Sequence, residues 1–174
     1  IVIVAIYRCC VMKRIKIKNG SIRFFGSKYT YFSIRPYLSY ITSENALFSK
    51  SLYYNITYGL NKKIIIEKKN TIMTKIIEYM NLFGLERFIS NIKTKNSIKL
   101  SKGQMQRVAI LRLFIHIIFN DRRILFLDEF TSNIDNDMEK TIFTELKNLQ
   151  KIYPFTLFYI SHNLISSSSD FFGI

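Results

Sequence analysis

The segment from residue 100 to residue 135 places polar residues at the ends of two apolar elements, and this alternation limits the possible folds. Ser101 is a typical helix N-cap, and Gln104 three residues later can complete a capping box. Apolar residues then recur at helical spacing around most of the helix axis, at Met105, Val108, Ala109, Leu111, Leu113, Phe114, Ile117 and Ile118. This pattern predicts a helix that begins after Ser101 and is mostly buried.

The helix is followed by a short apolar run, residues 124–127, that ends in Asp128 and Glu129. A continuous apolar run of this length is typical of a strand buried on both faces of a parallel sheet. A second mostly apolar run, residues 155–160, ends in a Ser-His pair whose second member is His162. Ligands of open α/β sheets bind beyond the carboxyl ends of the strands, so these polar residues are candidates for a site. An Asp-Glu pair after a strand can also simply cap the next helix.

The helix start and the strand ends both suit a phosphate ligand. A helix N-terminus offers free N–H groups and partial positive charge to an anion, and Gly103 in the first turn lets a ligand approach the backbone closely. A carboxylate at a strand end can hold Mg²⁺ through water, and a second carboxylate can orient or deprotonate an attacking water. The residues by themselves therefore indicate a site for magnesium and phosphate.

Four motifs in this part of the chain resemble those of the ATP-binding cassette (ABC) ATPases. The sequence LSKGQMQR at residues 100–107 resembles the signature motif, and ILFLDE at residues 124–129 resembles the Walker B strand. TSNID at residues 131–135 resembles the D-loop, and YISH at residues 159–162 resembles the strand that ends in the switch histidine. Each motif alone is a weak signal, but all four occur in the order and spacing of this family.

The resemblance implies an α/β fold, a P-loop NTPase-like ABC cassette with a mostly parallel core sheet and a helical subdomain that presents the signature. The 174 residues would form one partial nucleotide-binding domain, incomplete at both ends. Residues 1–48 and 121–174 would form the core sheet lobe, and residues 49–120 the helical subdomain. In the family, two cassettes dimerise head to tail, and each ATP lies between the phosphate loop of one and the signature of the other.

Carried over by position, the resemblance assigns binding roles to the polar residues of the signature and the D-loop. Ser101, Gly103 and Gln104 would face the γ-phosphate of an ATP bound on the partner cassette. Lys102 stands where the family usually has glycine, so either its charge favours a phosphate or its side chain crowds the interface. Asp135 would be the D-loop contact.

The resemblance also implies the catalytic and metal-binding groups. Asp128 would bind Mg²⁺, Glu129 would be the general base, and His162 would sense the γ-phosphate, with a buried structural histidine as the alternative. The glutamine that ends the Q-loop strand in the family is replaced by Ser43, with Glu44 beside it. A hydroxyl is shorter than a glutamine amide and an acid carries a charge, so these replacements put metal coupling at this position in question.

The phosphate-binding loop of the family, G-x-x-x-x-G-K-[ST], does not occur in the 174 residues. Residues 26–28, Gly-Ser-Lys, are its nearest imitation and lack a glycine next to the lysine. Residues 1–6 are predicted to form a strand, but the segment up to Gly20 is too short for the loop and the helix that follow in the family. Because the chain starts at Ile1 and ends in a Ser-rich segment, we expect a fragment or a degenerate copy. That loop supplies most of the grip on the β- and γ-phosphates, so we predict that this chain alone does not hydrolyse ATP at a rate typical of the family.

Residues 46–59, ALFSKSLYYNITYG, resemble the exporter-type segment after the Q-loop, which contacts the coupling helices of the transmembrane partner. The pattern is similar to that of mitochondrial half-transporters of the iron–sulfur export type. The alternative is a helix rich in Tyr and Phe that packs into its own core. The resemblance implies a cassette held at a plasma or organelle membrane, on the cytosolic or matrix side, by a transmembrane domain on the same or a separate chain.

The sequence predicts further elements around these motifs. Residues 35–42 resemble the strand that leads to the Q-loop, and residues 137–151 form an amphipathic pattern after the D-loop. Between the partner-facing segment and the signature, residues 61–69 are predicted as a basic loop around three isoleucines. Residues 71–83 and 85–92 have the spacing of a helix and of a second, shorter helix.

The net charge of +14 raises nucleic acid or an anionic membrane surface as partners. The lysines are spread along the chain, so we do not expect nucleic acid to be one. No apolar run reaches the roughly 18 residues that span a bilayer. The adjacent Cys9 and Cys10 form neither a zinc site nor a disulfide framework. His116 lies within the apolar helix and is predicted to be a core or rim residue.

Three functions stay open on the sequence alone. The first is the ATP-binding and ATP-hydrolysing cassette of an ABC exporter, with ATP and Mg²⁺ as cofactors. The second is a degenerate cassette that donates only its signature to the ATP of a partner. The third is a soluble ABC-type protein that acts on nucleic acid or ribosomes through its positive charge. The exporter-like residues 46–59 argue against the third.

Overall fold

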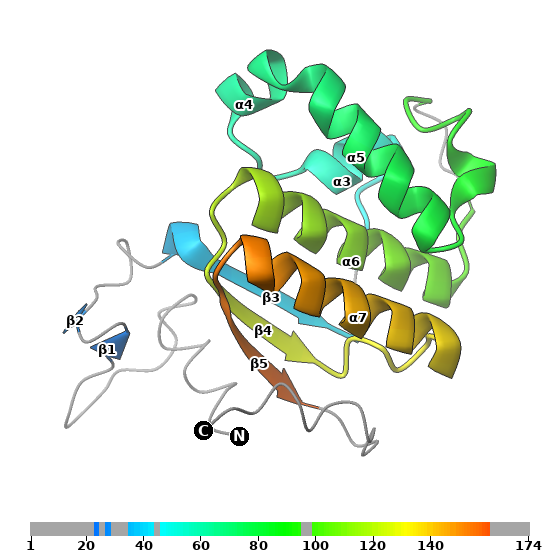
Figure 1. Cartoon of the computed structure of the whole chain (residues 1–174). Coiled ribbons are helices and arrows are strands. Elements are labelled where there is room, and N and C mark those ends of the chain that lie inside the picture. Colours follow the sequence, from blue (N-terminus) through cyan, green and yellow to red (C-terminus); the bar gives the residue numbers. More distant parts are fainter. Residues whose placement is uncertain (1–22, 25–26, 29–34, 44–45, 95–98, 161–174) are drawn as a thin grey trace.

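The structure, a computed structural model, describes residues 23–24, 27–28, 35–43, 46–94 and 99–160. Its centre is a three-stranded parallel sheet in the order β3-β4-β5 (Figure 1), formed by Leu38–Thr42, Ile124–Asp128 and Thr156–Ile160. The last residues of the three strands are in register, so the strands end at one edge. The side chains of residues 124–127 are buried, as their continuous apolar run predicts.

The strands predicted at residues 35–42, 124–127 and 155–160 are confirmed, with small shifts at their ends. The first three residues of the first segment form a 3-10 turn, η1 (Arg35–Tyr37), because Pro36 has no N–H to give to a sheet ladder. Two two-residue strands, β1 (Arg23–Phe24) and β2 (Ser27–Lys28), pair antiparallel as a separate sheet.

Two long helices, α6 (Lys102–Phe119) and α7 (Asn136–Ile152), lie on the same side of the parallel sheet (Figure 1). The predicted buried helix after Ser101 is α6, and the predicted amphipathic helix after the D-loop is α7. Apolar residues of α7 spaced three or four apart face inward, at Ile142, Phe143, Leu146 and Leu149. Phe143 packs edge-on against Tyr159 of β5, with ring centroids 5.1 Å apart, which fixes α7 to the sheet.

The other helices form a layer beyond α6, in the order α3 (Leu52–Thr57), α4 (Lys62–Glu67), α5 (Lys69–Leu82) and the 3-10 turn η2 (Glu86–Phe88) (Figure 1). Both α3 and α5 pack against α6. Phe114 of α6 is fully buried between the layers. Its ring centroid lies 5.2 Å from that of Tyr79 and 5.2 Å from that of Phe83, so three aromatic rings form the centre of this packing.

Two predictions for this layer were wrong or only partly right. The predicted basic loop at residues 61–69 contains the helix α4, because Asn61 caps it by accepting a hydrogen bond from the Lys63 N–H at 2.9 Å. Of the three isoleucines, Ile64 and Ile65 pack partly buried against the core, whereas Ile66 is 77% exposed. The predicted helix at residues 85–92 shortens to the single turn η2.

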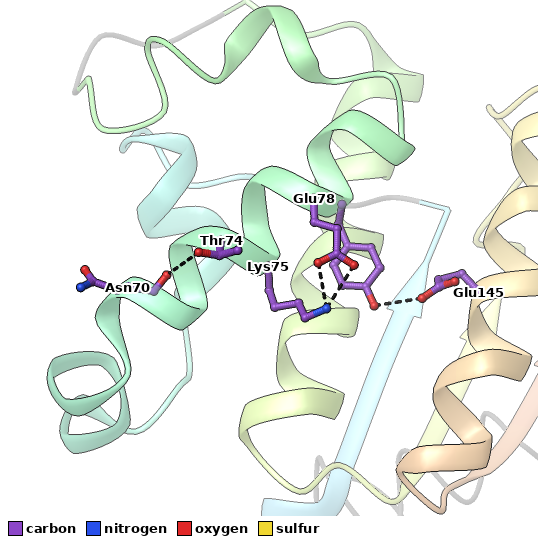
Figure 2. A network of polar contacts seen from close by, with 6 residues as sticks. Asn70, Thr74, Lys75, Glu78 and Glu145 are labelled. Carbon is purple, nitrogen blue, oxygen red and sulfur yellow. Dashed lines mark hydrogen bonds and ion pairs between the residues drawn. The ribbon is translucent and has the colours of Figure 1, made fainter.

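A polar contact links the outer layer to the helix that covers the sheet. The Tyr79 hydroxyl of α5 donates to Glu145 Oε1 of α7 at 3.1 Å, and Figure 2 shows Glu145 at this contact. Burial, followed by the Glu145 charge, raises the pKa of Tyr79, so the hydroxyl keeps its proton. On the neighbouring turn Lys75 pairs with Glu78 at 2.8 Å (Figure 2). None of the helices that the structure describes combines the length and the apolar character that a membrane crossing requires.

Candidate functional site

The helix α6 begins with both hydrogen bonds of a capping box. The Ser101 N–H donates to Gln104 Oε1 at 3.0 Å, and the Gln104 N–H donates to Ser101 Oγ at 3.3 Å. The cap predicted from the sequence is therefore confirmed. Ser101 and Lys102 are exposed, so this first turn lies at the surface of the molecule.

The acid pair lies at the carboxyl end of β4. Asp128 is in register with the last residues of both neighbouring strands, and its Oδ2 accepts a hydrogen bond from the Tyr40 hydroxyl at 3.1 Å. Glu129 leaves the strand with a φ of 48°, and its N–H donates to the Ile160 carbonyl at 2.9 Å. A positive φ in a residue other than glycine persists only where the surroundings hold it, so the fold sets the direction of the Glu129 side chain.

A cleft of about 580 Å³ brings the helix start and the strand ends together. Glu129 lies in its lining with Lys102 from the first turn of α6 and Ser43 from the end of β3. The other lining residues come from these same regions: Ala46, Met105, Gln106, Ser132 and Asn133. Three of the predicted site residues, far apart in the sequence, therefore meet in one surface cleft.

Five predicted site residues are not among the described residues that line the cleft: Ser101, Gly103, Gln104, Asp128 and Asp135. Asp135 is the N-cap of α7, and its Oδ1 accepts a hydrogen bond from the Met138 N–H at 2.9 Å. Its contact with a partner cassette stays a prediction. His162 and Glu44 lie outside the described residues, as does the predicted strand at residues 1–6.

Five residues that line the cleft were not predicted as site residues, and two of them, Gln106 and Asn133, are bonded to each other. A Cβ built on Gly103 would lie 2.6 Å from the Asn133 carbonyl oxygen, so the chain itself makes the close approach that we expected of a ligand. Gln106 is 1% exposed and hydrogen-bonds Asn133. The available signal was a glutamine within an otherwise apolar helical pattern, one turn after the glycine.

His116 is a core residue, as predicted from its place in the apolar helix, and is 6% exposed. Its Nε2 lies 2.9 Å from the Tyr58 carbonyl oxygen. This hydrogen bond joins α6 to the end of α3. Burial lowers the pKa of His116 to about 4, and the positive charges of Arg122 and Arg112 also lower it. The hydrogen bond to Tyr58 acts in the opposite direction, so burial decides that the ring is neutral at pH 7.

Three half-exposed rings, Phe48, Tyr54 and Tyr58, form what we call the aromatic face. Their exposed fractions are 43%, 41% and 47%, and the Phe48 and Tyr58 ring centroids lie 4.4 Å apart. Buried Asn55 holds Phe48 in place by accepting from its N–H at 2.8 Å and donating to its carbonyl at 3.0 Å. These three rings are therefore not packed into the core, which was the alternative for the aromatic side chains of residues 46–59.

Comparison with known proteins places this chain among ABC proteins. The family model described as ABC transporter matches residues 9–132. The chain is 32% identical over 149 residues to the spermidine/putrescine import ATP-binding protein PotA of Clostridium novyi (strain NT), covering 83% of this chain and 40% of that protein. It is 30% identical over 132 residues to the ATP-dependent lipid A-core flippase of Francisella tularensis subsp. holarctica (strain OSU18), covering 76% of this chain and 21% of that protein.

Among solved structures, a bacterial Atm1-family ABC exporter with ATP bound matches 96% of this chain and 28% of that chain, with a TM-score of 0.69 and 23% identity. At this identity the likeness shows the fold, and the predicted cassette fold with its parallel sheet is confirmed. The chain spans 40% of the length of PotA, and less of the flippase and of the Atm1-family exporter.

Proposed function

Because the chain belongs to the ABC transporter family, we propose that it is a nucleotide-binding cassette that shares ATP with a second cassette and drives transport through a transmembrane partner. The cleft that joins Ser43, Lys102 and Glu129 is the observation that supports this proposal most directly. It brings a capped helix start and a strand-end acid to one place, as a triphosphate ligand requires.

The first turn of α6 is the proposed contact for the γ-phosphate of an ATP held by the second cassette. Ser101 Oγ accepts the capping hydrogen bond, so its own hydrogen is left to donate to a phosphate oxygen. The partial positive charge of the helix start and the Lys102 ammonium add attraction for the anion. Gln104 uses both its N–H and its side chain in the capping box, so its proposed part is to hold Ser101 in place.

The end of β4 is the proposed catalytic side. Glu129 is the proposed general base toward an attacking water, with the Ser43 hydroxyl in the same cleft. Asp128 suits the Mg²⁺ that accompanies ATP, because this cation takes one or two carboxylates and fills its other positions with water and phosphate oxygens. The hydrogen bond from Tyr40 orients that carboxylate. His162 is the proposed sensor of the γ-phosphate by resemblance.

The 174 residues contain no G-x-x-x-x-G-K-[ST] loop, so in this proposal a second cassette with such a loop grips the phosphates. The test is ATP hydrolysis by that second cassette, measured with and without this chain in the presence of the transmembrane partner. Hydrolysis should rise as this chain is added and level off at an equimolar ratio. A rate that is the same with and without this chain would contradict the proposal.

The aromatic face is the proposed docking surface for the transmembrane partner. Half-exposed aromatic rings are the anchors that protein interfaces favour, and Asn55 presents this group on a fixed backbone. Residues 46–59 favour an exporter of the iron–sulfur half-transporter kind, which would place the cassette on the cytosolic or matrix side of its membrane. Residues 49–120 are the proposed helical subdomain, and residues 1–48 with 121–174 the core lobe.

Replacing Tyr54 and Tyr58 together by serine should reduce co-purification of the transmembrane partner by about tenfold, because two interface anchors are removed. The unfolding free energy of the free chain should change little, since both rings are half exposed. Tyr37→Ser is the matched control, because Tyr37 is 38% exposed and lies outside the aromatic face. Undiminished recovery of the partner with the double variant would show that this face does not dock it.

A further inference from the structure

Gln106 is a buried amide whose hydrogen-bond partners all belong to the loop after β4. It lies on α6 and is 1% exposed. Its Nε2 donates to the Phe130 carbonyl and, at 3.4 Å, to the Glu129 carbonyl. Its Oε1 accepts from the Asn133 N–H at 3.2 Å and from Asn133 Nδ2 at 3.1 Å. One side chain therefore holds the loop at both its first and its later residues.

Gly103 adds a second contact between the same helix and the same loop. Residues three apart on a helix share a face, so Gly103 and Gln106 are neighbours on α6. The Asn133 carbonyl oxygen would lie only 2.6 Å from a Cβ on residue 103, which is closer than a side chain there could tolerate. Asn133 is thus packed against the first turn of α6 through its carbonyl and bonded to the second turn through both of its N–H groups.

These contacts restrain a loop that begins in an unusual conformation. Glu129 has a φ of 48°, and the Gln106 amide reaches the carbonyl groups of Glu129 and of the next residue. An apolar side chain in place of the amide would remove four donor or acceptor contacts from the loop at once, including the contact of the buried Phe130. An apolar side chain at position 106 would therefore free the loop from the helix.

We propose that Gln106 is a positioning residue that fastens the loop carrying Glu129 to the helix carrying Ser101, so that the two move as one unit. The significance of this link for ATP rests on the function proposed above. A phosphate that draws the first turn of α6 toward a partner would then also shift Glu129, which acts on the other side of the cleft.

The link is tested by backbone amide exchange on the free chain without nucleotide. In Gln106→Met, which keeps the length of the side chain and removes its polar atoms, the Asn133 amide should exchange about tenfold faster or more than in the wild type. Amides in the middle of α7 should stay within about twofold of the wild type. The matched control is Gln150→Met, which removes a single hydrogen bond of 2.9 Å to the Phe155 carbonyl and should leave Asn133 unchanged.

Gly103→Ala changes a different contact between α6 and the same loop, so the test does not depend on Gln106→Met alone. Its methyl group should push the Asn133 carbonyl away and raise exchange in residues 129–134 as well. The proposal is overturned if neither variant changes this segment, or if exchange rises equally along α6 and α7, which would mean general destabilisation.

In the reconstituted pair, Gln106→Met should lower kcat for ATP and leave KM within about twofold, because a positioning group acts on the chemical step. A raised KM with unchanged kcat would contradict the positioning role. The exchange experiment contains no ATP, so its outcome is independent of the proposed function. Dependence of hydrolysis on this chain tests that function separately.

Discussion

Ser101→Arg should reduce the ATP hydrolysis that depends on this chain by about 100-fold or more, to the level of the second cassette alone. The variant removes the hydroxyl that is left free to donate and breaks the cap that orders the first turn. It also places a long guanidinium at an exposed helix start where two cassettes would meet. The measurement is steady-state hydrolysis by the reconstituted transporter at saturating Mg-ATP.

The control for Ser101→Arg adds the same charge at a place that no proposed contact uses. Thr144 is exposed on α7, so Thr144→Arg should retain the wild-type rate. Loss of the α6 cap costs about 1 kcal/mol, which a urea titration separates from the loss of activity. Full activity of the Ser101 variant would mean that the start of α6 does not touch the shared triphosphate.

Acidification from pH 7 to pH 4 should lower the unfolding free energy through His116 by about 3 kcal/mol. In the folded chain its pKa is lowered to about 4, and in the unfolded chain it is about 6.5. Above pH 6.5 the ring is neutral in both states and its full contribution is present. Between pH 6.5 and pH 4 the unfolded chain takes up the proton first, so stability falls as the pH falls. Below pH 4 this contribution levels off.

The variant His116→Gln isolates that contribution from the titrating carboxylates and from His162. A glutamine amide can still donate to the Tyr58 carbonyl and has no charge to gain. Urea unfolding at pH 7 and pH 4 should therefore show a drop that is about 3 kcal/mol smaller in this variant than in the wild type. Equal drops in the two proteins would place the pH dependence elsewhere.

The sequence predicted those parts of the fold that local pattern decides. The cap at Ser101, the buried helix behind it and the three parallel strands all follow from residues adjacent in the chain. The meeting of Ser43, Lys102 and Glu129 followed from family resemblance together with the rule that parallel strands end at one edge.

Most of what the sequence did not predict depends on partners that are distant in the chain, but one missed feature, the cap of α4, is local. Residues 61–69, with their three isoleucines, were predicted to be a basic loop, but the Asn61 cap starts the helix α4 there. Gln106 and Asn133 are 27 positions apart, and only the packing of α6 on the loop shows that they bond. Likewise, helical spacing could not distinguish exposed rings on α3 from core rings, because its other face, with Ile56, fills the core.

The most direct test of the shared site is a titration of Mg-ATP into this 174-residue chain alone, followed by an assay of turnover. The account predicts binding weaker than about 1 mM and no steady hydrolysis, because the groups that grip the β- and γ-phosphates belong to the other cassette. Tight binding with steady turnover that disappears in Glu129→Gln would contradict it, since the chain would then hold and hydrolyse its own triphosphate.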